Sequence, residues 1–222
     1  MSPLKIVLTV VVVIAYVALS HAALVIEDAF SVWRQLAVLM LIVPIAAFLC
    51  WSAVMTARQF GSGKVLSLLA GLVVGVACAW ATIGFWTILL TQLDWIYLIQ
   101  HVAANTMLCW FFLQTLYGGR TPIITTIART IHPDMPEGVV RYTRNVTVAW
   151  AIFFALQVLV SLAIFAIASI ETWSLFANVL NWPMVIAMFV AEYACRKHFN
   201  PDFRHASIRE SVLAYMNNRN KG

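Results

Sequence analysis

GGRTPIITTIARTIHPDMPEGVVRYTRN, residues 118–145, is the longest polar interruption before the carboxyl end of a chain that is 63% hydrophobic. The stretch holds four arginines, three prolines and one histidine. The chain as a whole has a mean hydropathy of +0.89 and only 10% charged residues, whereas about a quarter of the residues of a soluble domain are charged. The composition predicts an integral membrane protein, whose spans this interruption divides.

Six apolar runs are long enough to be transmembrane helices, since about 20 residues at a rise of about 1.5 Å cross the hydrocarbon. They cover approximately residues 4–26, 32–55, 65–90, 95–117, 146–170 and 173–195. None alternates with the period of two that barrel strands show. The sequence predicts an all-α polytopic fold, with one integral membrane domain over residues 1–222, a loop at 118–145 and a tail at 196–222.

The positive charges predict the side on which each connection lies, because cytoplasmic loops carry an excess of Lys and Arg. With six spans, thirteen of the fourteen Lys and Arg residues fall on one side. Only Arg34 falls on the other side, together with four acidic residues, Glu27, Asp28, Asp94 and Glu171. The sequence therefore predicts a multi-pass membrane protein with both termini in the cytoplasm.

A short helix is predicted inside the polar interruption. Thr121-Pro122 is typical of an N-cap followed by proline at the first helical position. Ile123, Ile127 and Ile131 then recur at intervals of four and form one apolar stripe. Because the segment is too short and too polar to span, it is expected to lie in the cytoplasmic interface between the fourth and fifth spans.

The fifth helix is expected to begin in the cytoplasm, because Asp134 and Glu137 have the spacing of a capping box. The cations of this region could form a basic bay that holds a phosphate through forked hydrogen bonds or meets an acidic protein. The alternative is that they only set the orientation and contact anionic lipids. The candidate anion-binding or partner-binding residues are Arg120, Arg129, His132, Arg141, Tyr142 and Arg144.

Two histidines lie within predicted spans, where ionisable groups are functional candidates. His21 and His101 are expected at similar depths, and His101 continues to Asn105 on a polar stripe of the fourth span. Two such histidines could ligate a b-type haem, bind a metal or pass a proton. The commoner alternative is a histidine whose hydrogen bonds are satisfied between packed helices.

The sixth span carries three further polar candidates. Glu192 precedes Arg196 by four residues, the favourable order for a helical ion pair. Asn178, Asn181 and Pro183 predict an irregular helix, because proline frees a carbonyl for which an asparagine can supply a donor. We interpret these residues mainly as packing features, with a lipid-sized groove as the alternative.

Catalytic and metal-binding motifs are absent from the sequence. It contains no nucleophile elbow, HExxH, clustered histidine boxes or phosphate-binding glycine loop. The four cysteines lie singly, without metal or disulfide spacing. The basic pI of about 9.2 follows from charges on one membrane face and does not indicate nucleic-acid binding. No catalytic residue, metal or resident cofactor is therefore predicted.

The segments RTPIITTIARTIHPDMPEGVVRYTRNVTVAW, residues 120–150, and WSLFANVLNWPMVIAMFVAEYACR, residues 173–196, resemble a family of small bacterial inner-membrane proteins. Members occur in gene clusters for aryl polyenes and related fatty-acid-like products and are sometimes labelled ketosynthases. The resemblance implies a context of synthesis, attachment or export of an acyl product. It does not carry a ketosynthase activity to this chain, because condensation needs a reactive cysteine with histidine partners.

Three functions follow as hypotheses. The first is a non-catalytic accessory or scaffold subunit that docks an acyl carrier protein, or a membrane biosynthetic or export enzyme, through its basic face, with membrane lipids around it. The second is a component of a lipid or proton-coupled transporter or flippase that uses His101, Asn105 and Glu192. The third is a b-type haem protein that uses His21 and His101.

Overall fold

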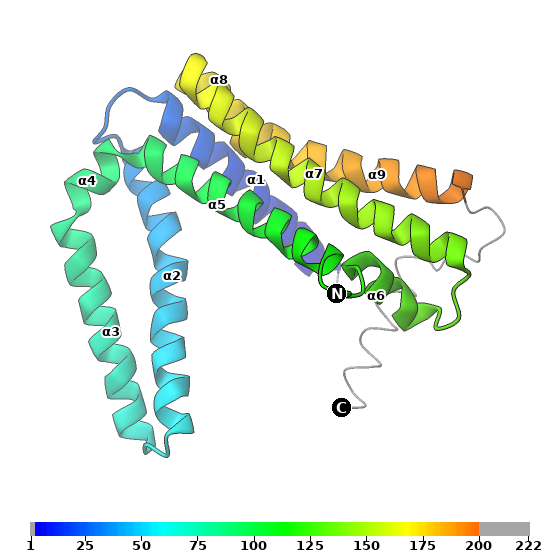
Figure 1. Ribbon diagram of the computed structural model, residues 1–222. Helices are drawn as coiled ribbons and strands as arrows, with labels where there is room; N and C mark the ends of the chain where they lie inside the picture. Colours follow the sequence, from blue (N-terminus) through cyan, green and yellow to red (C-terminus); the bar gives the residue numbers. More distant parts are fainter. Residues whose placement is uncertain (1–2, 200–222) are drawn as a thin grey trace. The chain divides into compact units, whose positions relative to one another are not determined.

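The computed structural model describes residues 3–199, so most of the predicted tail at 196–222 lies outside the described residues. The described chain is all-α and contains six helical segments long and apolar enough to cross a membrane. A short helix separates the fourth segment from the fifth. The predicted fold class is therefore confirmed, and the chain is a multi-pass membrane protein (Figure 1).

The chain divides into two compact units. The first unit extends to Leu98 and also includes Ala168–Val179, and the second contains Ile99–Ile167 and the chain from Leu180 onward. Five helices belong wholly to the first unit: α1 (Pro3–Val25), α2 (Val32–Gln59), α3 (Lys64–Gly84), α4 (Trp86–Thr91) and α8 (Ile170–Ser174). Three belong wholly to the second: α6 (Ile123–Ile131), α7 (Glu137–Ile167) and α9 (Asn181–Phe199). Helix α5 (Leu93–Leu113) contributes residues to both units.

One of the predicted spans, the third, differs from the helices observed. The third was predicted to run unbroken to Leu90, but α3 ends at Gly84 and the separate helix α4 follows. The end of α4 at Thr91 leaves the last carbonyls of that helix outside a continuing helical ladder, where they need other donors. The fifth begins at Glu137 and not at residue 146, so the predicted early start of this helix is confirmed.

The first unit contains a hairpin of α2 and α3, which run side by side (Figure 1). Gly61 forms the turn at a φ of +79°, a conformation that glycine adopts without strain. Along the hairpin, Gly71 faces α2 so closely that an added Cβ would lie 2.6 Å from Val54 Cγ2. Gly71, Gly75 and Ala79 follow one another at intervals of four on α3, and this small-residue ridge packs, at Gly71, against a helix of the same chain.

We expect Gly71→Ala to be less stable than Gly75→Ala by about 1–3 kcal/mol, the usual cost of overpacking. Both substitutions gain the same helix propensity, but an added Cβ at position 75 meets Cys50 Sγ at an ordinary 3.4 Å. The difference in unfolding free energy of the two purified variants therefore isolates the clash with Val54. Equal stabilities would contradict the close approach of α2 and α3.

A buried ion pair connects three helices of the first unit. Arg34 Nη2 on α2 donates to Asp94 Oδ1 on α5 at 3.1 Å, and Arg34 Nη1 donates to the carbonyl oxygen of Leu90 on α4 at 3.0 Å. The Arg34 side chain is 8% exposed and that of Asp94 31%. Leu90 lies in the last turn of α4, so the guanidinium also satisfies a carbonyl left over at a helix end.

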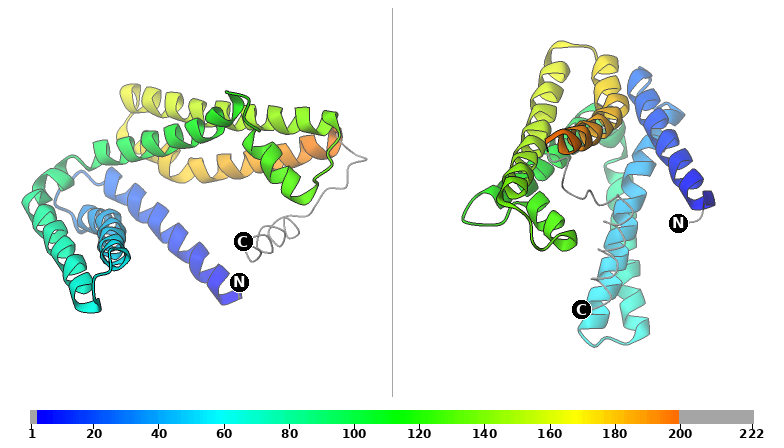
Figure 2. Two further views of the ribbon diagram at one scale, coloured as in Figure 1. Left: turned by 60° about the horizontal axis from the view of Figure 1, so that its bottom comes forward. Right: turned by 90° about the vertical axis from the view of Figure 1, so that its right-hand side faces the viewer.

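The second unit is packed around an aromatic cluster. Trp150 on α7 is 4% exposed, and its ring centroid lies 5.6 Å from that of Phe154, 5.9 Å from Phe112 on α5 and 4.7 Å from Phe189 on α9. Cys109 packs against the same cluster, where its thiol acts as a small apolar side chain. Ring contacts thus join α5, α7 and α9 within this unit. Figure 2 shows the backbones of these helices.

The last span is irregular, as its asparagines and proline predicted. Residues Leu175–Leu180 form a π-helix between α8 and α9. Pro183 has no N–H to donate, and its ring would clash with the carbonyl four residues earlier in a regular α-helix. A wider turn directly before the proline removes this conflict.

Candidate functional site at the ends of α6, α7 and α9

Helix α6 is fastened to α7 by a buried hydrogen bond. The hydroxyls of Thr125 on α6 and Thr143 on α7 lie 2.8 Å apart, and both residues are buried. The Thr143 hydroxyl donates its only proton to the carbonyl of Val140, at 2.9 Å, so it accepts the proton of Thr125. Ile124 adds an apolar contact to the Trp150 cluster. The short helix therefore has a defined position on α7.

The start of α6 differs from the predicted cap. The residue preceding the helix is Pro122, in an extended conformation, and not Thr121. The first helical N–H, that of Ile123, donates to Thr115 Oγ1 at 3.1 Å, so a hydroxyl from an earlier turn takes the place of the expected one. Ile127 is exposed, as a stripe facing lipid would require. His132 ends the helix, and its N–H donates to the carbonyl of Ala128.

Helix α7 begins two residues later than an N-cap at Asp134 would place it. Its first residue is Glu137, and the carbonyl of Pro136 accepts hydrogen bonds from the N–H groups of Val139, at 3.0 Å, and Val140, at 3.1 Å. The predicted Asp134–Glu137 capping box is therefore not formed. Pro136 starts the helix instead, because its fixed φ suits the residue that leads into a helix.

One face of α7 is buried along nearly its whole length. The buried residues follow steps of three and four, the period of a helix face. Because this face begins at Val139, the first turns of α7 are packed on protein and do not extend freely into solvent. The buried residues are Val139, Thr143, Val146, Thr147, Trp150, Ala151, Phe154, Gln157 and Ser161.

The exposed face of α7 changes from polar to apolar along the helix. Arg141, Arg144 and Asn145 occupy its first part, and Ile152 and Leu156 occupy the part that follows. Such a change is expected where a helix passes from headgroups into hydrocarbon. The sequence pattern and the burial therefore place Arg141 and Arg144 near one boundary of the membrane-spanning part of α7.

The predicted basic residues of the second unit are exposed. Arg120 precedes α6, Arg129 lies in its last turn, and Arg141 and Arg144 lie on α7. Within residues 3–199, none of these four arginines forms an ion pair. Their guanidinium groups are accessible, and the Thr125–Thr143 bond fixes the two helices that carry three of them.

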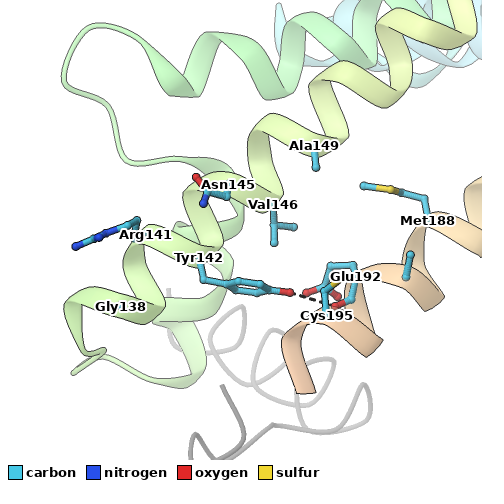
Figure 3. A pocket seen from close by; sticks show the side chains of 10 residues that line it. Gly138, Arg141, Tyr142, Asn145, Val146, Ala149, Met188, Glu192 and Cys195 are labelled. Carbon is cyan, nitrogen blue, oxygen red and sulfur yellow. Dashed lines mark hydrogen bonds between the residues drawn. The ribbon is translucent and has the colours of Figure 1, made fainter. Parts of the chain in front are cut away.

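A groove of about 600 Å³ lies beside Arg141, between α7 and α9 (Figure 3). We call it the α7–α9 groove. Its wall is largely apolar and includes Val146, Ala149, Met188 and Ala191. Its polar lining includes Arg141, Tyr142, Asn145 and Glu192, and Cys195 also lines it. Sequence reasoning had singled out Arg141, Tyr142 and Glu192 separately, and the structure brings them to one groove.

The acidic residue of the groove is already paired. Glu192 Oε1 lies 3.6 Å from Arg196 Nε, so the predicted ion pair one turn apart on α9 is confirmed. Tyr142 donates its hydroxyl proton to the backbone carbonyl of Glu192 at 3.1 Å, which connects α7 to α9 (Figure 3). Arg141 extends away from this contact (Figure 3). The groove therefore combines a neutralised acid, a bridging tyrosine and one accessible cation.

The polar residues inside the first unit form two hydrogen-bonded groups. His21 Nδ1 lies 2.9 Å from Ser174 Oγ, which accepts a bond from Asn178 Nδ2 at 3.0 Å. Tyr97 donates to Ser20 Oγ at 3.0 Å, and both residues are buried. Asn178 was expected to serve a carbonyl freed near Pro183, but its amide donates to a side-chain hydroxyl one turn earlier. The predicted packing histidine thus has a specific partner in Ser174.

In the second unit, Asn105 and His101 are hydrogen-bonded to each other one turn apart on α5. Asn105 Nδ2 donates to the carbonyl of His101 at 2.9 Å and lies 3.3 Å from His101 Nε2. Asn181 Oδ1 is buried and has no hydrogen-bond partner among the described residues. No group of three or more potential metal ligands occurs within residues 3–199.

Sequence reasoning missed the Arg34–Asp94 pair and the serines that complete the polar groups of the first unit. Arg34 had been counted only as the exception to the charge bias, and Asp94 only as one of the acidic residues on the same side. The sequence did contain a signal for this ion pair. Arginine stands at the start of one span and aspartate at the start of another, both on the same predicted side of the membrane.

No family model matches the sequence. Neither a curated protein nor a solved structure matches the chain.

Proposed function

We propose that this protein is a non-catalytic accessory or scaffold subunit of the bacterial inner membrane that docks an acidic partner through its exposed arginines. One observation carries the proposal: Arg129, Arg141 and Arg144 are accessible, have no ion pair within the described residues, and lie on two helices joined by the buried Thr125–Thr143 bond. A preorganised set of cations loses less freedom on binding than a set on a flexible loop.

The charge distribution supports a cytoplasmic location for this face. Thirteen of the fourteen Lys and Arg residues lie on the same side of six spans. The exception, Arg34, is buried against Asp94, so it acts as an internal ion pair and not as a loop charge. By the positive-inside bias, the arginine face and both termini belong in the cytoplasm.

The partner class follows from the charge and from the resemblance described above. A cationic surface attracts an acidic protein and accelerates its association. The resemblance to proteins of aryl-polyene clusters supports an acyl carrier protein, or a membrane enzyme of acyl assembly or export. In either case the subunit would keep the partner at the membrane surface, where a lipid-like product is made or leaves.

The proposal is tested with inside-out and right-side-out vesicles that contain the protein, mixed with acidic acyl carrier protein. We expect binding to inside-out vesicles only, and about tenfold weaker binding by the double variant Arg141→Ala/Arg144→Ala, since each exposed pair contributes up to about 1 kcal/mol. Binding should also weaken as ionic strength rises.

The matched control is Arg58→Ala/Lys64→Ala, which removes two exposed cations from the α2–α3 connection on the same predicted side. It should bind the carrier like the unmodified protein. Undiminished binding by the Arg141/Arg144 variant, or an equal loss in the control, would show that no specific arginine face exists. Binding to right-side-out vesicles alone would reverse the orientation and remove the proposal.

A further inference from the structure

Two grooves of similar size lie on membrane-spanning helices, one in each unit. The α7–α9 groove has a volume of about 600 Å³. The second, which we call the α2–α3 groove, has a volume of about 630 Å³ and includes Leu39, Val43, Cys78 and Trp86 in its lining. No charged residue lines the α2–α3 groove, whereas Arg141 and the paired Glu192 line the α7–α9 groove. The two grooves therefore offer similar space with different electrostatics.

We propose that the α7–α9 groove is a binding site for one anionic phospholipid, with an acyl chain along the apolar wall and the phosphate at Arg141. This site does not depend on the docking of an acidic partner. It lies where the exposed face of α7 changes from Arg141, Arg144 and Asn145 to apolar residues, at the level expected for headgroups.

The charges of the groove favour an anion at one position. Glu192 lies 3.6 Å from Arg196, so its carboxylate is neutralised within its own helix. Arg141 has no ion pair within residues 3–199, and its planar guanidinium can give two parallel hydrogen bonds to a phosphate. Asn145, one turn further along α7, supplies an amide donor on the same side. The uncompensated charge at the groove is therefore positive.

The apolar wall fits an acyl chain, but it does not by itself select one lipid over another. Lipid tails are as apolar as the side chains that they would contact, so burying a chain between α7 and α9 gains little over leaving it in the bilayer. Met188 is flexible and can adapt to the chain. Selectivity must then come from the headgroup. One basic residue near the membrane surface is expected to favour an anionic lipid over a neutral one about fivefold in affinity.

Two native cysteines allow the grooves to be compared in one protein. Cys195 lines the α7–α9 groove and Cys78 lines the α2–α3 groove, and both are free thiols. Single-cysteine variants, with the other three cysteines changed to Ala, are labelled with a small fluorophore and reconstituted. Quenching by brominated phosphatidylglycerol is then compared with quenching by brominated phosphatidylcholine.

We expect about fivefold preference for phosphatidylglycerol at Cys195 and none at Cys78. Arg141→Gln should abolish the preference at Cys195, whereas Arg144→Gln, on the same helix but outside the groove lining, should retain it. Equal quenching by the two lipids at Cys195, or a preference that survives Arg141→Gln, would overturn the proposal.

A second measurement avoids a label inside the groove. Native mass spectrometry of the unlabelled protein should show one retained phosphatidylglycerol, which is lost in Ala149→Trp because the indole fills the groove. Retention of the lipid in that variant overturns the site.

The same variant should still dock an acidic partner, whereas Arg144→Gln should weaken docking and keep the lipid, so failures of the two proposals are distinguishable.

A second copy of the chain is the competing occupant of the groove. Protection of Cys195 from labelling that increases with protein concentration, together with dimers in the same mass spectra, would identify that copy and would overturn the lipid site.

Discussion

Asp94→Asn should lower the free energy of unfolding by about 3 kcal/mol, although the substitution changes neither the size nor the shape of the side chain. Asparagine can still accept a hydrogen bond from Arg34 Nη2 but carries no charge. The guanidinium, 8% exposed, would then be buried without a counter-ion. We expect a value at the lower end of the range for broken buried pairs, because Asp94 is partly exposed and the Leu90 carbonyl remains bonded to Arg34.

The measurement is equilibrium unfolding of the purified protein in mixed micelles. Arg58→Ala is the matched control, since Arg58 lies on the same helix, α2, and is exposed. It should change stability by at most about 0.5 kcal/mol. Replacing both partners, in Arg34→Met/Asp94→Asn, should cost less than the two single changes together, because no isolated charge is left. An Asp94→Asn variant as stable as the control would show that the pair does not hold α2 and α5 together.

Trp150→Ala should also lower stability by about 3 kcal/mol or more, the usual cost of deleting a large buried side chain. In a bilayer this cost comes from lost packing and from the cavity left behind, and not from transfer out of water. Trp150 lies between α5 and α9, with rings of both helices within 5.9 Å of its own. The same unfolding measurement applies.

The control for this prediction is Trp110→Ala on α5, whose side chain is 63% exposed. It removes the same number of atoms but leaves the ring cluster intact, so its effect should stay within about 0.5 kcal/mol. Trp150→Phe should recover part of the loss by restoring an aromatic ring at the centre. Equal losses at positions 110 and 150 would mean that the cluster is not the packing centre of its unit.

The architecture could be predicted from sequence because its causes are local. Runs of about 20 apolar residues determine the six spans. Proline and asparagine spacing indicated the irregular sixth span, and the separation of Glu192 and Arg196 by one turn indicated their pair. These features depend on residues within one or two helical turns of each other, which a pattern along the chain can show.

The remainder depends on residues that are distant in sequence. Arg34 and Asp94 are 60 positions apart, and His21 and Ser174 are 153 apart. No period links such residues, and their meeting depends on how the helices pack. The helix break before α4 was missed because residues 65–90 are strongly hydrophobic and contain no charged residue. Hydropathy measures whether a segment prefers lipid and not whether its hydrogen-bond ladder is continuous.

The candidate site was predicted in its residues but not in its geometry. The arginines and Tyr142 were identified from composition, and Glu192 from its spacing to Arg196. That Tyr142 donates to the backbone of Glu192, and that a groove opens beside them, follows from the packing of α7 on α9. The cap of α6 was misassigned because the N–H of Ile123 bonds to the hydroxyl of Thr115, eight residues before Ile123, and not to that of Thr121.

The buried face of α7 has a consequence for which insertions the chain can accept. Each residue added to an α-helix turns everything beyond it by about 100°. Suppose that the core at Trp150 stays in place and one residue is inserted after Asn145. Arg141 and Arg144 would then turn by about 100° about the helix axis, and Thr143 would no longer face Thr125. Seven inserted residues, close to two full turns, would restore the angular phase. The direction in which the two arginines point therefore depends on the number of residues between them and Trp150 as well as on the identity of those residues.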